Sequence, residues 1–185
     1  MSLATPQQPI GDPYFSVMEI LIMLLAPLMV VFAATIYAWA PHEKKVFGLL
    51  ALVFMSLLAV LTCSVHFVIL TMSRQAAITA LTWAPLLLSF KWPSVAYALD
   101  ILAWDVFFAL SALFAAYVFE GSRLAAWIRA LLVVSGVLAL AGLNGIVSGD
   151  MQLRNIGVIG YVGVFPIAAL LLALLFLRAK PGLSA

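Results

Sequence analysis

Five long apolar stretches constrain what this chain can fold into more than any other feature of its sequence. They cover residues 15–40, 46–72, 93–119, 124–147 and 156–177, and each exceeds the about 20 apolar residues that a helix needs to cross a bilayer. Hydrophobic residues make up 66% of the chain and charged residues 9%, whereas a soluble domain carries about 25% charged residues. We therefore predict an all-α, polytopic integral membrane protein in which residues 1–185 form a single bundle of five transmembrane helices.

The segment between the second and third stretches, residues 73–92, differs from both of them. Its apolar core is short, and Arg74 and Lys91 bracket it. Such a length is typical of an interfacial or re-entrant segment rather than of a crossing helix. Because the segment joins two helices at one membrane face, we expect it to lie there, and the sequence leaves open whether it is a lid or dips back into the bilayer.

Basic residues outside the apolar stretches predict the orientation of the chain. Five crossings place its two ends on opposite sides, so the basic residues fall into two groups. One side would carry Lys44, Lys45, Arg123, Arg178 and Lys180, and the other would carry Arg74, Lys91 and Arg154 beside an exposed N-terminal arm, residues 1–13, that has neither Lys nor Arg. Cytoplasmic loops carry the excess of Lys and Arg. This count favours an N-terminus outside and a C-terminus in the cytoplasm.

Two carboxylates, Asp100 and Asp105, interrupt the third stretch. An ionisable side chain at this depth costs about 3 kcal/mol or more unless it finds a partner or water. At about 100° per residue, Asp100 shares one helical stripe with Tyr97 and Trp104, which is typical of a pocket wall. Asp105 lies on another stripe, whose small residues predict a helix-packing face, namely Ala98, Ala109, Ala112 and Ala116.

Four of the apolar stretches carry a polar residue at a similar height. Counted at about 1.5 Å per residue from the predicted cytoplasmic ends, Glu19, His66, Asp100 and Asn144 all lie roughly 30 Å along their helices, and Tyr161 lies slightly deeper. This level is near the outer boundary of a hydrocarbon core about 30 Å thick. We therefore expect four helices to bring these side chains into one enclosed pocket in the outer leaflet.

The residue types in this layer favour acid–base chemistry. A histidine exchanges a proton near neutral pH, and an acid and a base held apart in a dry pocket can move protons to and from carbon or oxygen. We predict that Asp100 or Glu19 is the proton donor and that His66 is the partner base. The predicted substrate-binding residues are aromatic walls, an amide and a cation for an anionic head group, namely Tyr97, Trp104, Tyr161, Trp83, Asn144 and Arg74.

Three of these residues also have a structural interpretation. Glu19 lies near a helix end, from which an amphipathic side chain can reach water. His66 would serve as well as a hydrogen-bonded bridge between helices. Asn144, in the sequence Leu-Asn-Gly, is more typical of a helix end than of a ligand contact.

For Asp105, a structural pairing is the favoured interpretation. Arg129 is a cation within an apolar stretch, but its height differs from that of Asp105 by about 10 Å. We therefore expect Asp105 to bond to Thr62 or Ser64 on the second helix.

The chain lacks the sequence patterns of metal and cofactor chemistry. It contains no HExxH, no CxxC, no P-loop and no GxSxG sequence. Its single cysteine, Cys63, excludes an intramolecular disulfide and a multi-thiolate metal site. We therefore predict no metal site and no cofactor. Independently, the small net charge of +2 argues against a nucleic-acid partner.

Three classes of function remain open from the sequence. The first is a small membrane enzyme that performs cofactor-free isomerisation or proton-initiated cyclisation of a lipophilic substrate. The second is a proton-linked small-molecule transporter or a ligand-binding membrane sensor, although the chain lacks the paired repeats of many transporters. The third is an accessory membrane subunit whose polar groups only join helices. The expected partners are membrane lipids and a lipophilic small molecule, and a homo-oligomer is left open.

Overall fold

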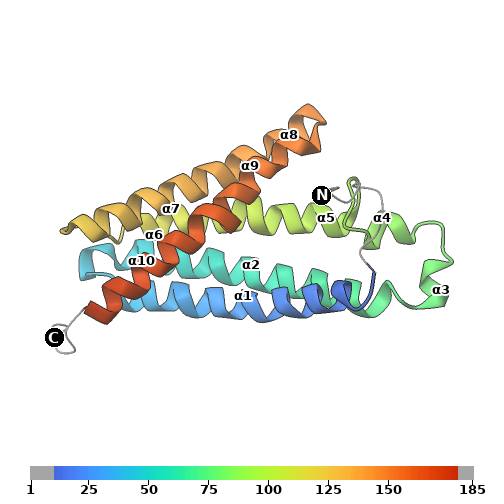
Figure 1. Cartoon of the computed structure of the whole chain (residues 1–185), viewed down its shortest axis with the longest axis horizontal. Helices are drawn as coiled ribbons and strands as arrows, with labels where there is room; N and C mark the ends of the chain where they lie inside the picture. Colours follow the sequence, from blue (N-terminus) through green and yellow to red (C-terminus); the bar gives the residue numbers. More distant parts are fainter. Residues whose placement is uncertain (1–10, 179–185) are drawn as a thin grey trace.

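The computed structural model describes residues 11–178, and this part of the chain is an all-α bundle without strands. Residues 1–10 and 179–185, which include most of the predicted N-terminal arm and Lys180, lie outside the described residues. Within the described residues, five helical rods are long and apolar enough to cross a membrane (Figure 1), namely Tyr14–Trp39, His42–Met72, Val95–Ala116, Arg123–Ser148 and Met151–Arg178. The predicted bundle of five helices is confirmed.

Each rod consists of one or more helical elements. The first is α1 (Tyr14–Trp39), and the second joins η1 (His42–Lys44) to α2 (Lys45–Met72). The third joins α5 (Val95–Ile101), the π-helix η2 (Leu102–Phe107) and α6 (Phe108–Ala116). The fourth joins α7 (Arg123–Gly142) to α8 (Asn144–Ser148). The fifth joins η3 (Met151–Arg154), α9 (Asn155–Val158), the π-helix η4 (Ile159–Val164) and α10 (Phe165–Arg178).

Helix caps move the boundaries of the third rod. It begins at Val95 rather than at 93, because the Ser94 hydroxyl caps it by accepting a hydrogen bond of 3.1 Å from the Tyr97 N–H. It ends at Ala116 rather than at 119. The turn that follows contains Gly121, whose φ of 86° suits a residue without a side chain.

The fifth rod begins earlier than the sequence predicts. Its first helical residue is Met151 rather than 156, because the Asp150 carboxylate accepts a hydrogen bond of 3.0 Å from the Gln152 N–H and caps the turn. The start predicted for the fifth stretch, residue 156, is therefore wrong, because only residues 149–150 separate the fourth and fifth rods. As a consequence, Arg154 belongs to a helix instead of a loop.

Residues 73–92 form two short helices, α3 (Ala76–Thr79) and α4 (Ala84–Leu88), and neither is long enough to cross a membrane. Both lie beyond the end of α2, at one end of the bundle (Figure 1). We call this end, which also carries residues 149–150, the segment end. The opposite end carries the turns at residues 40–44 and 117–122.

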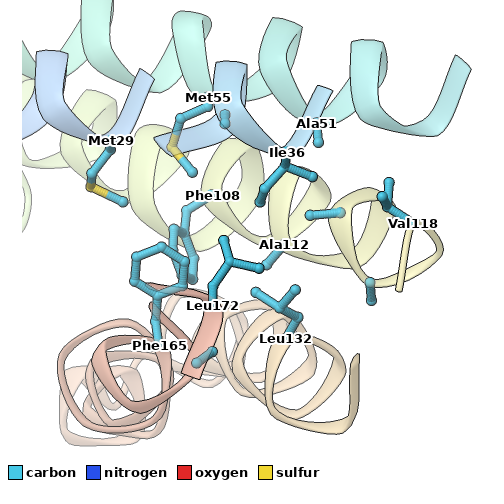
Figure 2. Close-up of a cluster of buried hydrophobic side chains, with 14 of the residues drawn as sticks. Met29, Ile36, Ala51, Met55, Phe108, Ala112, Val118, Leu132, Phe165 and Leu172 are labelled. Carbon is cyan, nitrogen blue, oxygen red and sulfur yellow. The ribbon is translucent and has the colours of Figure 1, made fainter. Parts of the chain in front are cut away.

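The apolar core lies between α1, α2, α6, α7 and α10, whose side chains meet in Figure 2. Small residues let these helices approach closely: Ala109, Ala112 and Ala116 of α6 are at most 2% exposed. Three of the four alanines predicted for the packing face are therefore buried, whereas Ala98 is exposed. The aromatic ring of Phe108 fills the space between them and the fifth rod, with its centroid 5.0 Å from that of Phe165.

Candidate functional site

Five ionisable residues from four rods form one connected group at the segment end, which we call the ionic cluster. Its members are Glu19 of α1, His66 of α2, Asp100 of α5, Asp105 of η2 and Arg154 of η3. Acids alternate with the imidazole and the guanidinium along it. The side chains are between 0% and 14% exposed, so the cluster is enclosed by the bundle.

Glu19 and His66 form the first pair of the cluster. The Nδ1 atom of His66 lies 2.7 Å from Oε2 of Glu19, which is a hydrogen-bond distance. Glu19 faces inward because it shares the buried stripe of α1 with Ala26 and Met29. As a residue it is 4% exposed, so the alternative in which its carboxylate reaches water is wrong. His66 joins two helices, as its structural interpretation expects, but only one ring nitrogen is used for this bond.

The second ring nitrogen of His66 faces Asp100. Its Nε2 atom lies 3.8 Å from Oδ1 of Asp100, which is too long for a hydrogen bond. The ring of Phe90, from the segment between α4 and α5, lies beside the imidazole with 4.9 Å between centroids. Phe90 thereby covers one side of the imidazole. The sequence does not predict this contact, because the contact depends on how residues 73–92 lie against the bundle.

Arg154 joins the two carboxylates of the third rod. Its Nε atom donates to Oδ2 of Asp105 at 2.9 Å, and its Nη2 atom donates to Oδ2 of Asp100 at 3.1 Å. The guanidinium carbon also lies 4.7 Å from the ring centroid of Tyr97, a cation–π contact. One cation therefore connects the acid that faces His66 to an acid that is fully buried.

The expected bonds from Asp105 to the second helix are wrong. The hydroxyl of Ser64 donates to the Val60 carbonyl at 2.7 Å, and Thr62 has no hydrogen-bond partner within residues 11–178. Asp105 pairs with Arg154 instead, because Asp150 caps the fifth rod early enough to put Arg154 into its first turn. Asp is a favoured residue at the N-cap of a helix, so Asp150 was a signal for this start, although it lies six residues before the apolar stretch that begins at 156.

The π-helix η2 explains why two acids on different predicted stripes meet the same cation. Residues five apart in an α-helix are turned about 140° from each other at about 100° per residue. A π-helix closes its hydrogen bonds between residues five apart, so it brings such residues toward one face. Asp105 lies within η2, and Asp100 lies just before it.

Three of the predicted substrate-binding residues lie beside the cluster. Tyr97 contacts Arg154, as described above, and Trp104 lies in the same rod between the two acids, 8% exposed. The ring of Tyr161 packs against Trp104 with 5.2 Å between centroids. These three rings surround the cluster on the side of the third and fifth rods.

The other three predicted residues lie elsewhere. Asn144 is exposed and donates to the Ala141 carbonyl of its own rod at 2.9 Å, as its helix-end interpretation expects. Trp83 is 45% exposed in the turn before α4. Arg74 forms an ion pair of 2.6 Å with Asp12 at the start of α1. The structure therefore does not bring them to the ionic cluster.

The charges of the cluster do not balance without added protons. With every acid ionised and His66 neutral, three negative charges stand against the single positive charge of Arg154. Uncompensated charge in a low-dielectric interior is costly. Two protons, shared among the imidazole and the acids, would make the cluster neutral. A histidine is the residue type in this cluster that ordinarily exchanges a proton near neutral pH.

Metal and family comparisons add no further assignment. Within residues 11–178, no group of three or more His, Cys, Asp or Glu side chains has a geometry that could hold a metal ion. The chain matches no family model, no curated protein and no solved structure. Its function is therefore argued from the geometry of the cluster.

Proposed function

We propose that the protein is a small integral membrane enzyme that performs cofactor-free acid–base chemistry on a lipophilic substrate, either an isomerisation or a proton-initiated cyclisation. One observation carries the proposal. His66 is held through Nδ1 by Glu19 at 2.7 Å, while its Nε2 faces the Asp100 carboxylate at 3.8 Å. A base oriented by a hydrogen bond on one side and open on the other is the arrangement that catalytic proton transfer uses.

In this proposal His66 and Asp100 are the catalytic pair, and Glu19 is a positioning residue. In an isomerisation, one member of the pair removes a proton from a substrate carbon, the electron pair moves to form a new double bond, and the other member delivers a proton to a second carbon. In a cyclisation, one member protonates a double bond, the ring closes, and the other member removes a proton. Either sequence leaves the number of protons and electrons unchanged.

The surroundings of the pair support a lipophilic substrate. Phe90, Tyr97 and Trp104 supply aromatic faces that stabilise a developing cation. A pocket of about 520 Å³ lies at the segment end, where Ser73, Thr79 and residues 84–85 and 88–89 line it. Residue 89 of this lining directly precedes Phe90 in the sequence, and Phe90 packs on His66. We further propose that the N-terminus is outside and the C-terminus cytoplasmic, which places the cluster in the outer leaflet.

Deuterium incorporation tests this function while the substrate is still unidentified. The purified protein is incubated in heavy water with a lipid extract of the membranes of its own organism, and mass spectrometry finds lipids that gain deuterium on carbon. We expect wild-type protein and the His42→Gln variant to label the same lipid, because His42 lies in η1 at the opposite end. His66→Gln should reduce labelling to the level without protein. Equal labelling by His66→Gln and wild type would refute the proposal.

The alternation of charges along the cluster favours a second candidate, a proton-linked transporter. Acids, imidazole and guanidinium connect α1 to η3 across the bundle, as a proton relay would. This candidate predicts proton flux into sealed vesicles that contain only the purified protein and a pH gradient. Flux that requires His66, without deuterium in any lipid, would favour the transporter over the enzyme.

A further inference from the structure

We propose that Arg154, held by Asp105, is a positioning residue that fixes Asp100 opposite the free nitrogen of His66. This inference rests on the proposed function for its catalytic consequence, but its geometric part stands separately. It assigns a role to Arg154 and Asp105, the two members of the cluster that do not face His66.

The bonds of Arg154 are specific for a guanidinium. Two different nitrogen atoms reach two different carboxylates, Nε to Asp105 at 2.9 Å and Nη2 to Asp100 at 3.1 Å. The planar fork of Arg presents its donors at fixed angles, whereas the ammonium group of Lys is a single point charge on a flexible stem. Because Asp100 uses Oδ2 for Arg154, its Oδ1 is the oxygen directed at His66. The guanidinium thus determines which way the carboxylate faces.

Asp105 acts on the site only through Arg154. Its side chain is 0% exposed, so no substrate can touch it. One of its oxygens bonds to Arg154, and the other, Oδ1, has no hydrogen-bond partner within the described residues. Such a buried, half-satisfied acid is costly to keep. The presence of this carboxylate in an otherwise apolar part of the bundle is explained if Asp105 is needed to hold the guanidinium of Arg154 in place.

The absence of a side chain at Gly157 makes room for this anchor. A Cβ atom at position 157 would lie 2.7 Å from Oδ1 of Asp105, closer than such atoms approach in proteins. Gly157 therefore lets the carboxylate of Asp105 rest against the backbone of α9, three residues after Arg154. A methyl group there would displace Asp105 without removing any charged group.

Other glycines provide matched controls. A Cβ atom at Gly136 of α7 would lie 2.8 Å from Leu113 and 2.9 Å from the Ala109 carbonyl, a similar crowding whose nearest atoms belong to no member of the ionic cluster. A Cβ atom at Gly163 would meet nothing closer than 3.8 Å. Gly136→Ala thus controls for overpacking, and Gly163→Ala controls for the substitution itself.

The test uses the histidine resonances of the full-length protein. In the His42→Gln background, isotope-labelled histidine reports His66 alone, since the chain has two histidines. The chemical shift of Nε2 is measured in lipid nanodiscs for Arg154→Lys, Asp105→Asn, Gly157→Ala and the two glycine controls. Thermal unfolding and the rate of deuterium incorporation are measured on the same samples.

The inference predicts that Arg154→Lys, Asp105→Asn and Gly157→Ala move the Nε2 resonance and lower the rate of incorporation about 100-fold, the loss expected when a reacting group is misplaced by about 1 Å. Gly163→Ala should change neither quantity, and Gly136→Ala should lower the unfolding temperature without moving the resonance. Should Arg154→Lys fail to fold, Gly157→Ala carries the test, because it keeps every charged group.

Two results would overturn the inference. One is an Nε2 resonance that stays at its wild-type position in Gly157→Ala and in the Arg154 and Asp105 variants that fold. The other is a shift in Gly136→Ala as large as that in Gly157→Ala, which would show a general effect of packing. If the resonance moves as predicted but wild-type protein incorporates no deuterium, the proposed function fails and the positioning role stands.

Discussion

The two halves of the ionic cluster are built from the same kinds of groups but differ in what they leave free. In the Arg154–Asp105 half, the acid is 0% exposed and the guanidinium 9%, and the pair is buried between the third and fifth rods. In the Glu19–His66 half, the imidazole is 12% exposed, and its Nε2 atom has no hydrogen bond to another of the described residues. We infer from this difference that the Arg154–Asp105 half is a fixed support and that the Glu19–His66 half exchanges a proton. The following predictions test this division.

The largest effect on stability is expected from removing the guanidinium of Arg154. Arg154→Leu leaves Asp100 and Asp105 without their cation inside the bundle, and breaking a buried ion pair costs about 3–5 kcal/mol of unfolding free energy. The measurement is reversible unfolding in mixed micelles. The control is Arg129→Leu, which removes an exposed cation of α7 and should change stability by about 0.5 kcal/mol or less. Equal losses in the two variants would contradict a supporting role for Arg154.

Removing the imidazole of His66, in the Glu19–His66 half, should affect activity far more than stability. In His66→Gln the amide can still donate to Glu19, so we expect a loss of about 1 kcal/mol, together with complete loss of deuterium incorporation. The same two assays, unfolding and incorporation, measure both quantities. A loss of stability in His66→Gln as large as that in Arg154→Leu would show that the two halves have the same structural role.

Glu19→Gln should separate orientation from proton transfer. The carboxylate only accepts a hydrogen bond, whereas an amide can also donate one, so the imidazole would no longer be held with its proton on Nδ1. We expect incorporation to fall about 100-fold, as for a misoriented base, and the two forms of neutral His66 to coexist. The rate assay and the histidine resonances measure these outcomes, and an unchanged rate would remove Glu19 from the site.

The aromatic cover is expected to have a smaller effect. Phe90 packs on the imidazole and, with Phe15, against Val65 and Ile69. Phe90→Ala should raise the amide hydrogen exchange of residues 73–94 and lower incorporation several-fold, because water gains access to the pair. Phe67→Ala, which removes a ring that is 58% exposed on α2, is the control. Equal exchange in both variants would show that Phe90 does not cover the site.

The smallest predicted effect concerns the contact between the start of α1 and the segment. A hydrogen bond from Ser16 and the charge of Arg74 hold the pKa of Asp12 below its usual value of 3.8. A lowered pKa in the folded state stabilises the contact above the unfolded value, and this contribution is lost as the pH falls through the folded value. Hydrogen exchange near residue 74, divided by its intrinsic rate at each pH, should therefore rise as the pH falls from about 5 to about 3 in wild type but not in Arg74→Gln. The same rise in both would exclude the Asp12–Arg74 pair as its cause.

The sequence predicted the positions of the five rods better than the membership of the ionic cluster. Length and hydropathy locate the five rods because a bilayer needs helices of a certain length. The depth count brought Glu19, His66 and Asp100 to one level, since three rods of regular α-helix at their ends preserve the rise per residue. It failed for Asn144, whose side chain is exposed and bonds within its own rod, because a count along the helix does not determine the direction in which a residue points.

The sequence did not predict the Arg154–Asp105 half of the cluster, for two local reasons. Arg154 was assigned to a loop, although the Asp150 cap starts the helix before it. Asp105 was assigned to a stripe away from Asp100, because a regular α-helical period cannot represent the π-helix η2. Both errors concern backbone geometry, and the hydrophobic pattern of an all-apolar rod carries no signal for either.

We infer that His66 is held through Nδ1 and exchanges its proton through Nε2. The most direct measurement follows both imidazole nitrogens of His66 across a pH titration, in isotope-labelled His42→Gln protein reconstituted in a bilayer. We predict that Nδ1 stays protonated throughout the titration and that Nε2 alone gains and loses a proton. A titration in which Nδ1 loses its proton while Nε2 keeps one would contradict it.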